Sequence, residues 1–178
     1  MTTRRLLLSG LALLACTAAL AHGPSRQKVS ETVVIDAPPE KVWTVIGNFQ
    51  DMGWHPAVTS QEGQGGNAPD GATRKLTLQG GGVLEETLTK YSAEDHSYSY
   101  RIEKVDVKVL PVNNYSSTIT VGDAGGGKST VEWRGAFYRG FLNNDPPPEL
   151  NDDAALKAVS GLYRGGLDAL KAKIETGK

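Results

Sequence analysis

The chain has few of the residues that carry covalent or metal chemistry. Its 178 residues include one cysteine, Cys16, and three histidines, His22, His55 and His96. One thiol cannot form an intramolecular disulfide, and the three histidines do not stand at the spacing of a metal site. We therefore expect a domain that folds on its hydrophobic core, with no metal and no cofactor.

An excess of charge of one sign is also missing. The chain has 19 Lys and Arg residues against 20 Asp and Glu residues, whereas a nucleic-acid-binding domain would present a basic face. After the N-terminus there is no apolar run long enough to span a membrane. The Gly-x-Ser-x-Gly motif of many serine hydrolases is absent as well. The balanced charge excludes nucleic acid as a partner. The sequence also gives no support for a transmembrane segment after the N-terminus or for a serine nucleophile.

The one long apolar run lies at the N-terminus. Arg4 and Arg5 precede the apolar residues 6–20, and the run closes on the small-x-small triplet Ala19-Leu20-Ala21. This pattern is typical of a secretory signal peptide. We therefore expect residues 1–21 to be removed, leaving 157 of the 178 residues, and we expect the mature protein to be periplasmic.

Two other interpretations of the N-terminus stay open. Residues 13–16, Leu-Leu-Ala-Cys, resemble a bacterial lipobox, which would leave Cys16 lipidated. Residues 3–7, Thr-Arg-Arg-Leu-Leu, resemble a twin-arginine signal, so the sequence does not choose between the general secretory route and the twin-arginine route.

The mature chain opens with a short polar segment, residues 22–28, which we interpret as a flexible leader before a single domain over residues 29–175. Residues 29–37 alternate between apolar and polar side chains and predict a strand. Pro38 and Pro39 end it, and Pro39 suits the first turn of a helix. A short helix pair is expected next, with the second helix at residues 51–54.

Six further segments have the alternation and the flanking turn residues of strands, which predicts an antiparallel sheet of about seven strands. They are residues 57–63, 73–79, 83–91, 96–104, 115–121 and 129–138. Residues 151–174 then carry an apolar stripe at helical spacing and predict a long amphipathic helix. Gly165 and Gly166 each cost this helix about 1 kcal/mol relative to alanine, which indicates close packing or space for a ligand.

This order of elements resembles the α+β helix-grip fold of the START and polyketide cyclase superfamily, often called SRPBCC. The opening segment "VVIDAPPEKVWTVIGNFQDMGWHPAV" is similar to the start of that superfamily's domain. The segments "GGVLEETLTKYSAEDHSYSYRI", "LPVNNYSSTITV" and "GLYRGGLDALK" continue the resemblance in order, over residues 29–173. The resemblance implies a curved sheet wrapped on the C-terminal helix, with a cavity between them.

Within the superfamily the chain is most similar to the MxaD type, on the signal peptide, the "AHGP" start of the mature chain and the "MGWHPAV" segment. MxaD-type proteins are small exported proteins associated with periplasmic methanol oxidation. The resemblance implies an accessory role with methanol dehydrogenase and its cytochrome c acceptor as partners.

Trp54 and His55 follow the short helices, and the resemblance places them at the mouth of the cavity. One interpretation is that Trp54 packs on the long helix while His55 points to solvent. A second is that both contact a ligand, since tryptophan offers a large apolar face with one donor. A third is catalysis by His55, for which the sequence identifies no orienting partner beyond the nearby Asp51.

Glu85 and Glu86 are adjacent on one strand and must point to opposite faces of the sheet. An E-x-L pattern of the superfamily falls on Glu86, which is therefore expected to face inward and to form a buried pair with Arg74. The alternative is a polar patch that orients a ligand. The ligand-binding candidates are Trp54, His55, Arg74, Glu86, Tyr98, Tyr100 and Tyr163.

Three functions follow, in decreasing order of support. The first is a non-enzymatic accessory protein of methanol oxidation, and the second is a carrier of a small hydrophobic ligand or lipid. The third is a cyclase or dehydratase that uses Glu86 or His55 as acid or base. It ranks last because the sequence offers few titratable groups, and no catalytic residue is assigned.

Overall fold

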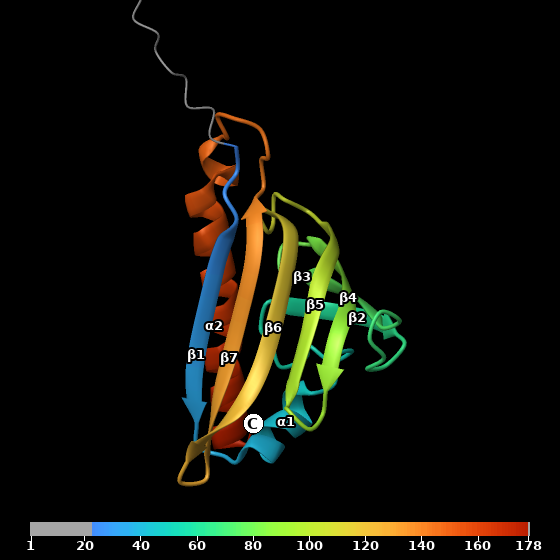
Figure 1. Ribbon diagram of the computed structural model, residues 1–178, viewed down its shortest axis with the longest axis vertical. Helices are drawn as coiled ribbons and strands as arrows, with labels where there is room; N and C mark the ends of the chain where they lie inside the picture. Colours follow the sequence, from blue (N-terminus) through green and yellow to red (C-terminus); the bar gives the residue numbers. More distant parts are fainter. Residues whose placement is uncertain (1–22, 178) are drawn as a thin grey trace, which may run out of the picture.

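The protein folds as one curved antiparallel sheet with a long helix lying along its inner face, as the computed structural model describes for residues 23–177 (Figure 1). The strand order is β1-β7-β6-β5-β4-β3-β2. The elements are β1 (Gln27–Ile35), α1 (Pro39–Ile46), β2 (Val58–Gln64), β3 (Thr73–Leu78), β4 (Val83–Ser92), β5 (Ser97–Val105), β6 (Val112–Gly125), β7 (Lys128–Arg139), the 3-10 turn η1 (Pro148–Leu150) and α2 (Asp152–Thr176). This confirms the predicted α+β helix-grip fold.

Helix α2 forms where the sequence supplies a cap at each end. The Asn151 side chain accepts a hydrogen bond from the Ala154 N–H, and Asp152 and Asp153 place negative charge in the first turn. Gly177 ends the helix in the left-handed conformation that glycine adopts without strain. One side of α2 is buried against β1 and β7, through Ala155, Val159, Tyr163, Gly166, Leu167, Leu170 and Ile174.

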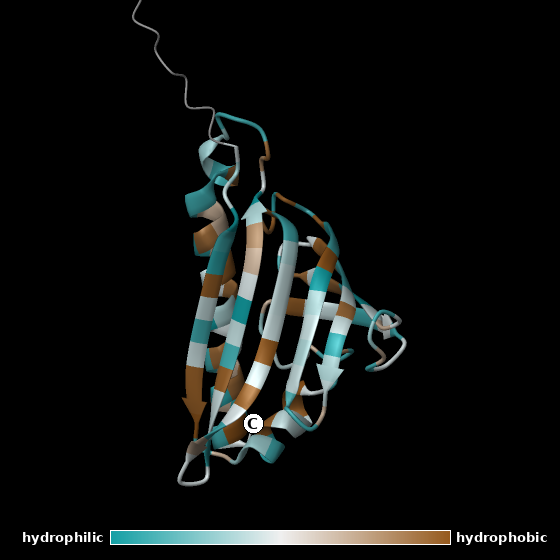
Figure 2. Ribbon diagram, in the orientation of Figure 1, coloured by the Kyte–Doolittle hydropathy of each residue, from teal (hydrophilic) through white to brown (hydrophobic). Residues whose placement is uncertain are grey.

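The two faces of the sheet differ in chemistry. Side chains on the inner face are large and buried, as Val131, Trp133 and Phe137 are on β7. Their neighbours on the opposite face, which we call the outer face, are mostly polar, and the strands therefore carry alternating hydrophilic and hydrophobic bands (Figure 2). The core thus lies between α2 and the inner face, where any enclosed site must form.

Two details differ from the sequence prediction. Strand β1 begins at Gln27 and not at Val29, because Gln27 and Lys28 already pair with Phe137 and Ala136 on β7. The second short helix at residues 51–54 does not form. The Asp51 carboxylate accepts from the Gly53 N–H at 2.8 Å, and the Gln61 side chain accepts from the Met52 N–H at 2.6 Å, so side chains replace helical hydrogen bonds there.

The predicted signal peptide at residues 1–21 and the lipobox at Cys16 lie outside the described residues, and both stay predictions. Within residues 23–177, no helix is long and apolar enough to cross a membrane.

Candidate functional site

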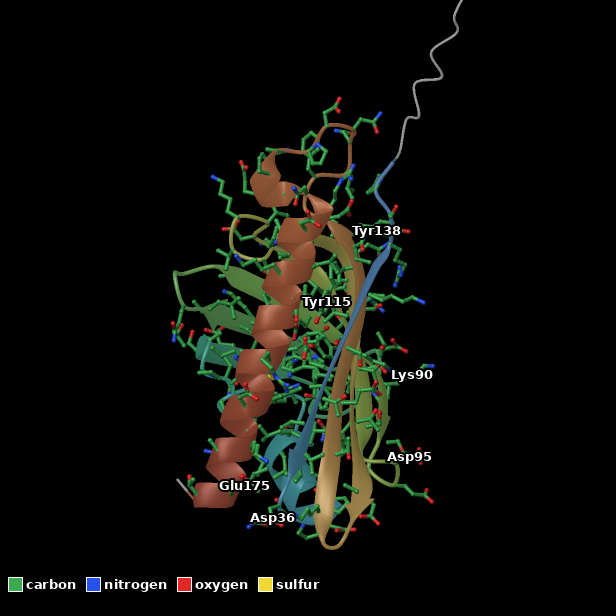
Figure 3. All side chains as sticks on the ribbon, turned by 90° about the vertical axis from the view of Figure 1, so that its left-hand side faces the viewer. Asp36, Lys90, Asp95, Tyr115, Tyr138 and Glu175 are labelled. Atoms are coloured by element: carbon green, nitrogen blue, oxygen red, sulfur yellow. The ribbon has the colours of Figure 1, made fainter. Side chains whose placement is uncertain are left out.

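The space between α2 and the sheet holds a cluster of aromatic rings. The Trp133 ring on β7 stacks on the Tyr163 ring of α2, with ring centres 4.4 Å apart and an interplanar angle of 14°. Trp54, from the segment after α1, lies 5.7 Å from the same Trp133 ring. Tyr115 of β6 also lies between helix and sheet (Figure 3). All four rings are buried, so aromatic packing holds α2 against the sheet.

Ser117 of β6 stands at the centre of a buried hydrogen-bond network. Its Oγ accepts from the Trp133 Nε1–H at 2.9 Å, and the Tyr163 hydroxyl lies 2.9 Å from it. The Tyr163 hydroxyl also bonds to the Tyr115 hydroxyl, and the Trp133 Nε1–H lies 3.2 Å from the Tyr100 hydroxyl. Burial raises the pKa of Tyr100, Tyr115 and Tyr163. These phenols are therefore neutral at pH 7 and cannot act as bases there.

Arg74 and Glu86 form an enclosed ion pair next to this network. They stand opposite each other on β3 and β4, and Arg74 Nε donates to Glu86 Oε2 at 2.6 Å. Arg74 Nη1 also donates to the Phe49 carbonyl at 2.7 Å, and the guanidinium lies over the Phe49 and Tyr100 rings. The geometry confirms that Glu86 faces inward and pairs with Arg74; a role in ligand binding stays a prediction.

The charges of this pair depend on each other. Burial raises the pKa of Glu86, and the Arg74 guanidinium opposes that rise. Burial alone lowers the pKa of Arg74, but Glu86 offsets it and leaves the pKa of Arg74 raised. An arginine keeps its proton in proteins, and a 2.6 Å contact favours the carboxylate. We therefore treat both groups as ionised. An ionised Glu86 carries no proton to donate, so it cannot act as a general acid.

Two polar atoms beside the pair have no hydrogen-bond partner among the described residues. They are Nη2 of Arg74 and the hydroxyl oxygen of Tyr98, and both are buried. A buried donor without a partner is uncommon in proteins and is usually satisfied by ordered water or by a bound group. The Arg74 guanidinium also opposes the rise that burial causes in the pKa of Tyr98, so the two groups lie near each other and interact directly.

His55 lies under α2, and the interpretation that it points to solvent is wrong. Its exposed fraction is 3%. His55 Nδ1 accepts from the Ala57 N–H at 3.1 Å, which leaves the proton on Nε2 to be donated to the Leu162 carbonyl at 3.0 Å. Burial lowers the pKa of His55. Both ring nitrogens are thus occupied by the backbone, and the imidazole joins the loop to α2 as a neutral group.

An apolar pocket lies between α2 and the inner face of strands β2 to β7. Its volume is about 20 Å³, which is room for about one water molecule. Its lining includes three of the candidate residues, Glu86, Tyr100 and His55. The remaining lining is Met52, Val58, Leu76, Leu78, Leu84, Ile102, Leu110, Tyr115, Trp133 and Leu162.

The structure brings only some of the predicted candidates to this pocket. His55, Glu86 and Tyr100 line it, whereas Trp54, Arg74, Tyr98 and Tyr163 are buried in the packing around it. Met52, Tyr115, Trp133 and Leu162 line the pocket but were not among the candidates. For Tyr115 and Trp133 the strand alternation carried a signal, because both share a face with buried apolar neighbours. Met52 and Leu162 carry no such signal, since their positions depend on how α2 meets the loop.

Several solved structures are similar to this chain. The protein XoxI from Bacillus cereus is 29% identical, with a TM-score of 0.69 over 83% of this chain and 95% of that one. A protein from Nitrosospira multiformis is 27% identical, with a TM-score of 0.69 over 85% of this chain and 100% of that one. No curated protein matches the chain by sequence.

Norcoclaurine synthase from Thalictrum flavum, solved with dopamine and hydroxybenzaldehyde, shares the fold at 13% identity. Its TM-score is 0.63, and the match covers 99% of both chains. At that identity the likeness concerns the fold alone. The family comparison is firmer, because the sequence profile for polyketide cyclases, dehydrases and lipid transport proteins matches residues 26–175, nearly the whole described chain. The chain therefore belongs to the polyketide cyclase/dehydrase and lipid transport family, within the SRPBCC superfamily.

Proposed function

We propose that this protein binds a small, mainly apolar ligand in the pocket between α2 and the sheet, without a catalytic step. The observation that carries the proposal is the pocket's composition: aliphatic and aromatic side chains surround it, and its lining includes one carboxylate, that of Glu86, and two phenols, those of Tyr100 and Tyr115. Such a mixture of apolar walls and a few polar groups is typical of small-molecule sites. The family match supports it, since the family includes lipid transport proteins.

The volume of the pocket limits the ligand and the way it enters. About 20 Å³ is far below the roughly 300 Å³ or more of most ligand sites. Binding therefore requires side chains at the mouth to move. Val58, Ile102 and Leu162 are only partly buried there, and they can move without opening the core. We expect a ligand of a single ring or a short chain, with one donor group that reaches Glu86.

Binding without catalysis follows from the state of the titratable groups. His55 uses both ring nitrogens on backbone groups, and Glu86 gives one carboxylate oxygen to Arg74. A general acid or base needs a proton that it can exchange with the substrate. Neither group meets that condition in this arrangement.

The test is a titration with benzyl alcohol, which has one ring and one donor, followed by amide NMR shifts. Shifts should concentrate at Met52, Leu84 and Tyr100, with a dissociation constant on the order of 1 mM for so few atoms. Ile102→Trp at the mouth should abolish the shifts, and Val34→Trp, on the exposed part of β1, should leave them unchanged. Shifts that persist in the Ile102→Trp variant would refute binding in this pocket.

A second candidate function is the accessory role in methanol oxidation, with methanol dehydrogenase and a cytochrome c as partners in the periplasm. The nearly filled interior favours it, because a protein with so little free volume can act through its surface. The test measures electron transfer from methanol dehydrogenase to its cytochrome with the protein added. An accessory surface should keep its effect in the Ile102→Trp variant, and a carrier should lose it. An absence of any stimulation by the unmodified protein would refute the accessory role.

A further inference from the structure

The outer face of the sheet carries a continuous row of polar side chains. The strand registers place one residue of each of five neighbouring strands in line, because each pairs directly with the next. From β1 to β4 the row is Ser30, Arg134, Thr118, Ser99 and Lys90. Lys28 lies in the next row, on the same face as Ser30. Figure 3 shows Lys90 on the side of the sheet away from α2.

Between the two ends of this row the surface is shallow and lined by hydroxyl groups. The Ser99 and Thr118 hydroxyls bond to each other at 2.8 Å, so each keeps further capacity for a ligand. One hollow of about 610 Å³ spans Lys28, Ser116 and Arg134. A second, of about 560 Å³, continues past Arg134 to Lys90. Small side chains thus leave room beside exposed cations.

Three cations of this face, Lys28, Lys90 and Arg134, have no acidic partner among the described residues. Lys28, Lys90 and Arg134 are exposed, and none of them takes part in an ion pair. The acids on this face have other partners: Glu132 accepts from Ser30, Asp95 accepts from the Ser92 hydroxyl, and Glu103 pairs with Arg101. The chain as a whole has a net charge of −1. Lys28, Lys90 and Arg134 therefore keep their charge uncompensated by direct contact, on the same face as the Glu132 and Asp95 carboxylates.

We propose that the outer face, through Lys28, Lys90 and Arg134, docks an extended acidic segment of a partner protein. Neighbouring strands are about 4.8 Å apart, so Arg134 and Lys90 are separated by three spacings, roughly 14 Å. An extended chain covers that distance in about four residues. Carboxylates at both ends of such a segment would meet the cations, and the hydroxyls between them would donate to its middle.

The shape of the sheet distinguishes a polypeptide from other anions. The sheet curves around α2, so its outer face is convex (Figure 1). A flat bilayer touches a convex surface along a narrow strip, and it would engage few of the three cations together. A flexible acidic segment can follow the curve. This docking does not depend on ligand binding in the pocket, which opens on the other side of the sheet.

The test uses a fluorescein-labelled peptide of ten glutamates as the probe, followed by fluorescence anisotropy at low salt and at about 0.2 M salt, where exposed charges are screened beyond roughly 8 Å. The triple variant Lys28→Glu/Lys90→Glu/Arg134→Glu is compared with Lys41→Glu/Lys108→Glu/Lys157→Glu. The control residues are exposed, form no ion pair, and lie on α1, α2 and the turn after β5. Both variants change net charge equally, and circular dichroism checks that both remain folded.

We expect the unmodified protein to bind the peptide at low salt, and the outer-face variant to bind at least about tenfold more weakly. Each exposed ion pair between the protein and the peptide strengthens binding by up to about fivefold. The control variant should lose less than about threefold, and high salt should weaken binding in all cases. Equal losses in the two variants, or no binding at about 1 mM peptide, would overturn the proposal. Tighter binding to vesicles of anionic phospholipid, lost in the outer-face variant, would assign the face to a membrane and overturn it as well.

Discussion

Arg74 shows at the scale of single residues how a buried charge is held. Its guanidinium is enclosed, and it is stabilised by the Glu86 carboxylate, the Phe49 carbonyl and two aromatic faces. Removing an ion from water costs several kcal/mol, so the pair is favourable only while both partners are present. The intact pair therefore adds little net stability, whereas the loss of one partner leaves the other as an uncompensated buried charge.

The first prediction is that Glu86→Gln destabilises the fold strongly. The change leaves the Arg74 guanidinium buried without its counter-ion, and breaking such a pair costs about 3–5 kcal/mol of unfolding free energy. Glu85→Gln is the matched control. Glu85 faces solvent and pairs with the exposed Lys104, so its loss should cost less than about 1 kcal/mol. Urea denaturation measures both; a Glu86→Gln cost no greater than that of the control would contradict the enclosed ion pair.

The second prediction concerns His55 and pH. Burial holds the pKa of folded His55 below its ordinary value of 6.5, so the unfolded chain binds a proton more readily than the folded chain does. His55 therefore contributes its full stability above about pH 6.5, and that stability is lost as the pH falls toward the folded pKa, by up to about 1.4 kcal/mol per pH unit.

His55→Gln, which keeps a donor toward Leu162, should remove this slope between about pH 6.5 and pH 5. His96→Gln, on the turn before β5, is the control and should keep it. The test compares the urea denaturation midpoints of the two variants and the unmodified protein across this pH range. An unchanged slope in the His55→Gln variant would show that other groups carry the pH dependence.

At the scale of elements, the two adjacent glycines of α2 have different roles. A Cβ at Gly166 would stand 2.5 Å from the His55 ring and 2.9 Å from the Trp133 ring, so this glycine allows α2 to approach the loop and the sheet. A Cβ at Gly165 meets no atom within 4 Å. Of the two interpretations of this pair, close packing explains Gly166, and nothing in the structure explains Gly165.

The third prediction follows as a pair of opposite effects. Gly166→Ala should destabilise the protein by about 1–3 kcal/mol, since the His55 ring is held by two hydrogen bonds and cannot yield easily. Gly165→Ala should stabilise it by about 0.5–1 kcal/mol, since alanine favours an exposed helical position. Thermal or urea denaturation of both variants provides the comparison. Effects of the same sign would contradict the close contact at Gly166.

The sequence predicted the elements well and the site only in part, for a physical reason. Alternation along a strand is local, so the strands and the opposite directions of Glu85 and Glu86 could be predicted from residue order, and the resemblance to the superfamily implied that Glu86 is the one that faces inward. The position of His55 could not, because it depends on Leu162 and Gly166, more than 100 residues away. The helix expected at residues 51–54 failed because local side-chain hydrogen bonds from Asp51 and Gln61 outweigh a weak helical propensity.

At the scale of the whole molecule, α2 also protects one edge of the sheet. Arg164 donates to the Thr32 carbonyl at 3.1 Å, and Lys171 donates to the Val34 carbonyl at 2.5 Å, so the free edge of β1 is covered. The Glu175 carboxylate accepts from the Asp36 N–H at 2.8 Å and ties the end of α2 to the end of β1. These contacts hold the C-terminal half of β1, the first strand of the fold, against α2.

The last prediction concerns export and rests on where the fold begins. Strand β1 starts at Gln27, and its pairing with β7 uses no residue before Gln27. Cleavage after Ala21 would therefore leave every described strand and helix intact. A chain of residues 22–178 should unfold at the same urea concentration as a full-length chain purified without cleavage. In the native host, N-terminal sequencing of the periplasmic fraction should give His-Gly-Pro-Ser. A chain that begins at Met1 in the cytoplasm would refute export. A lipidated N-terminus at Cys16 would show that the chain is processed at the lipobox and not after Ala21.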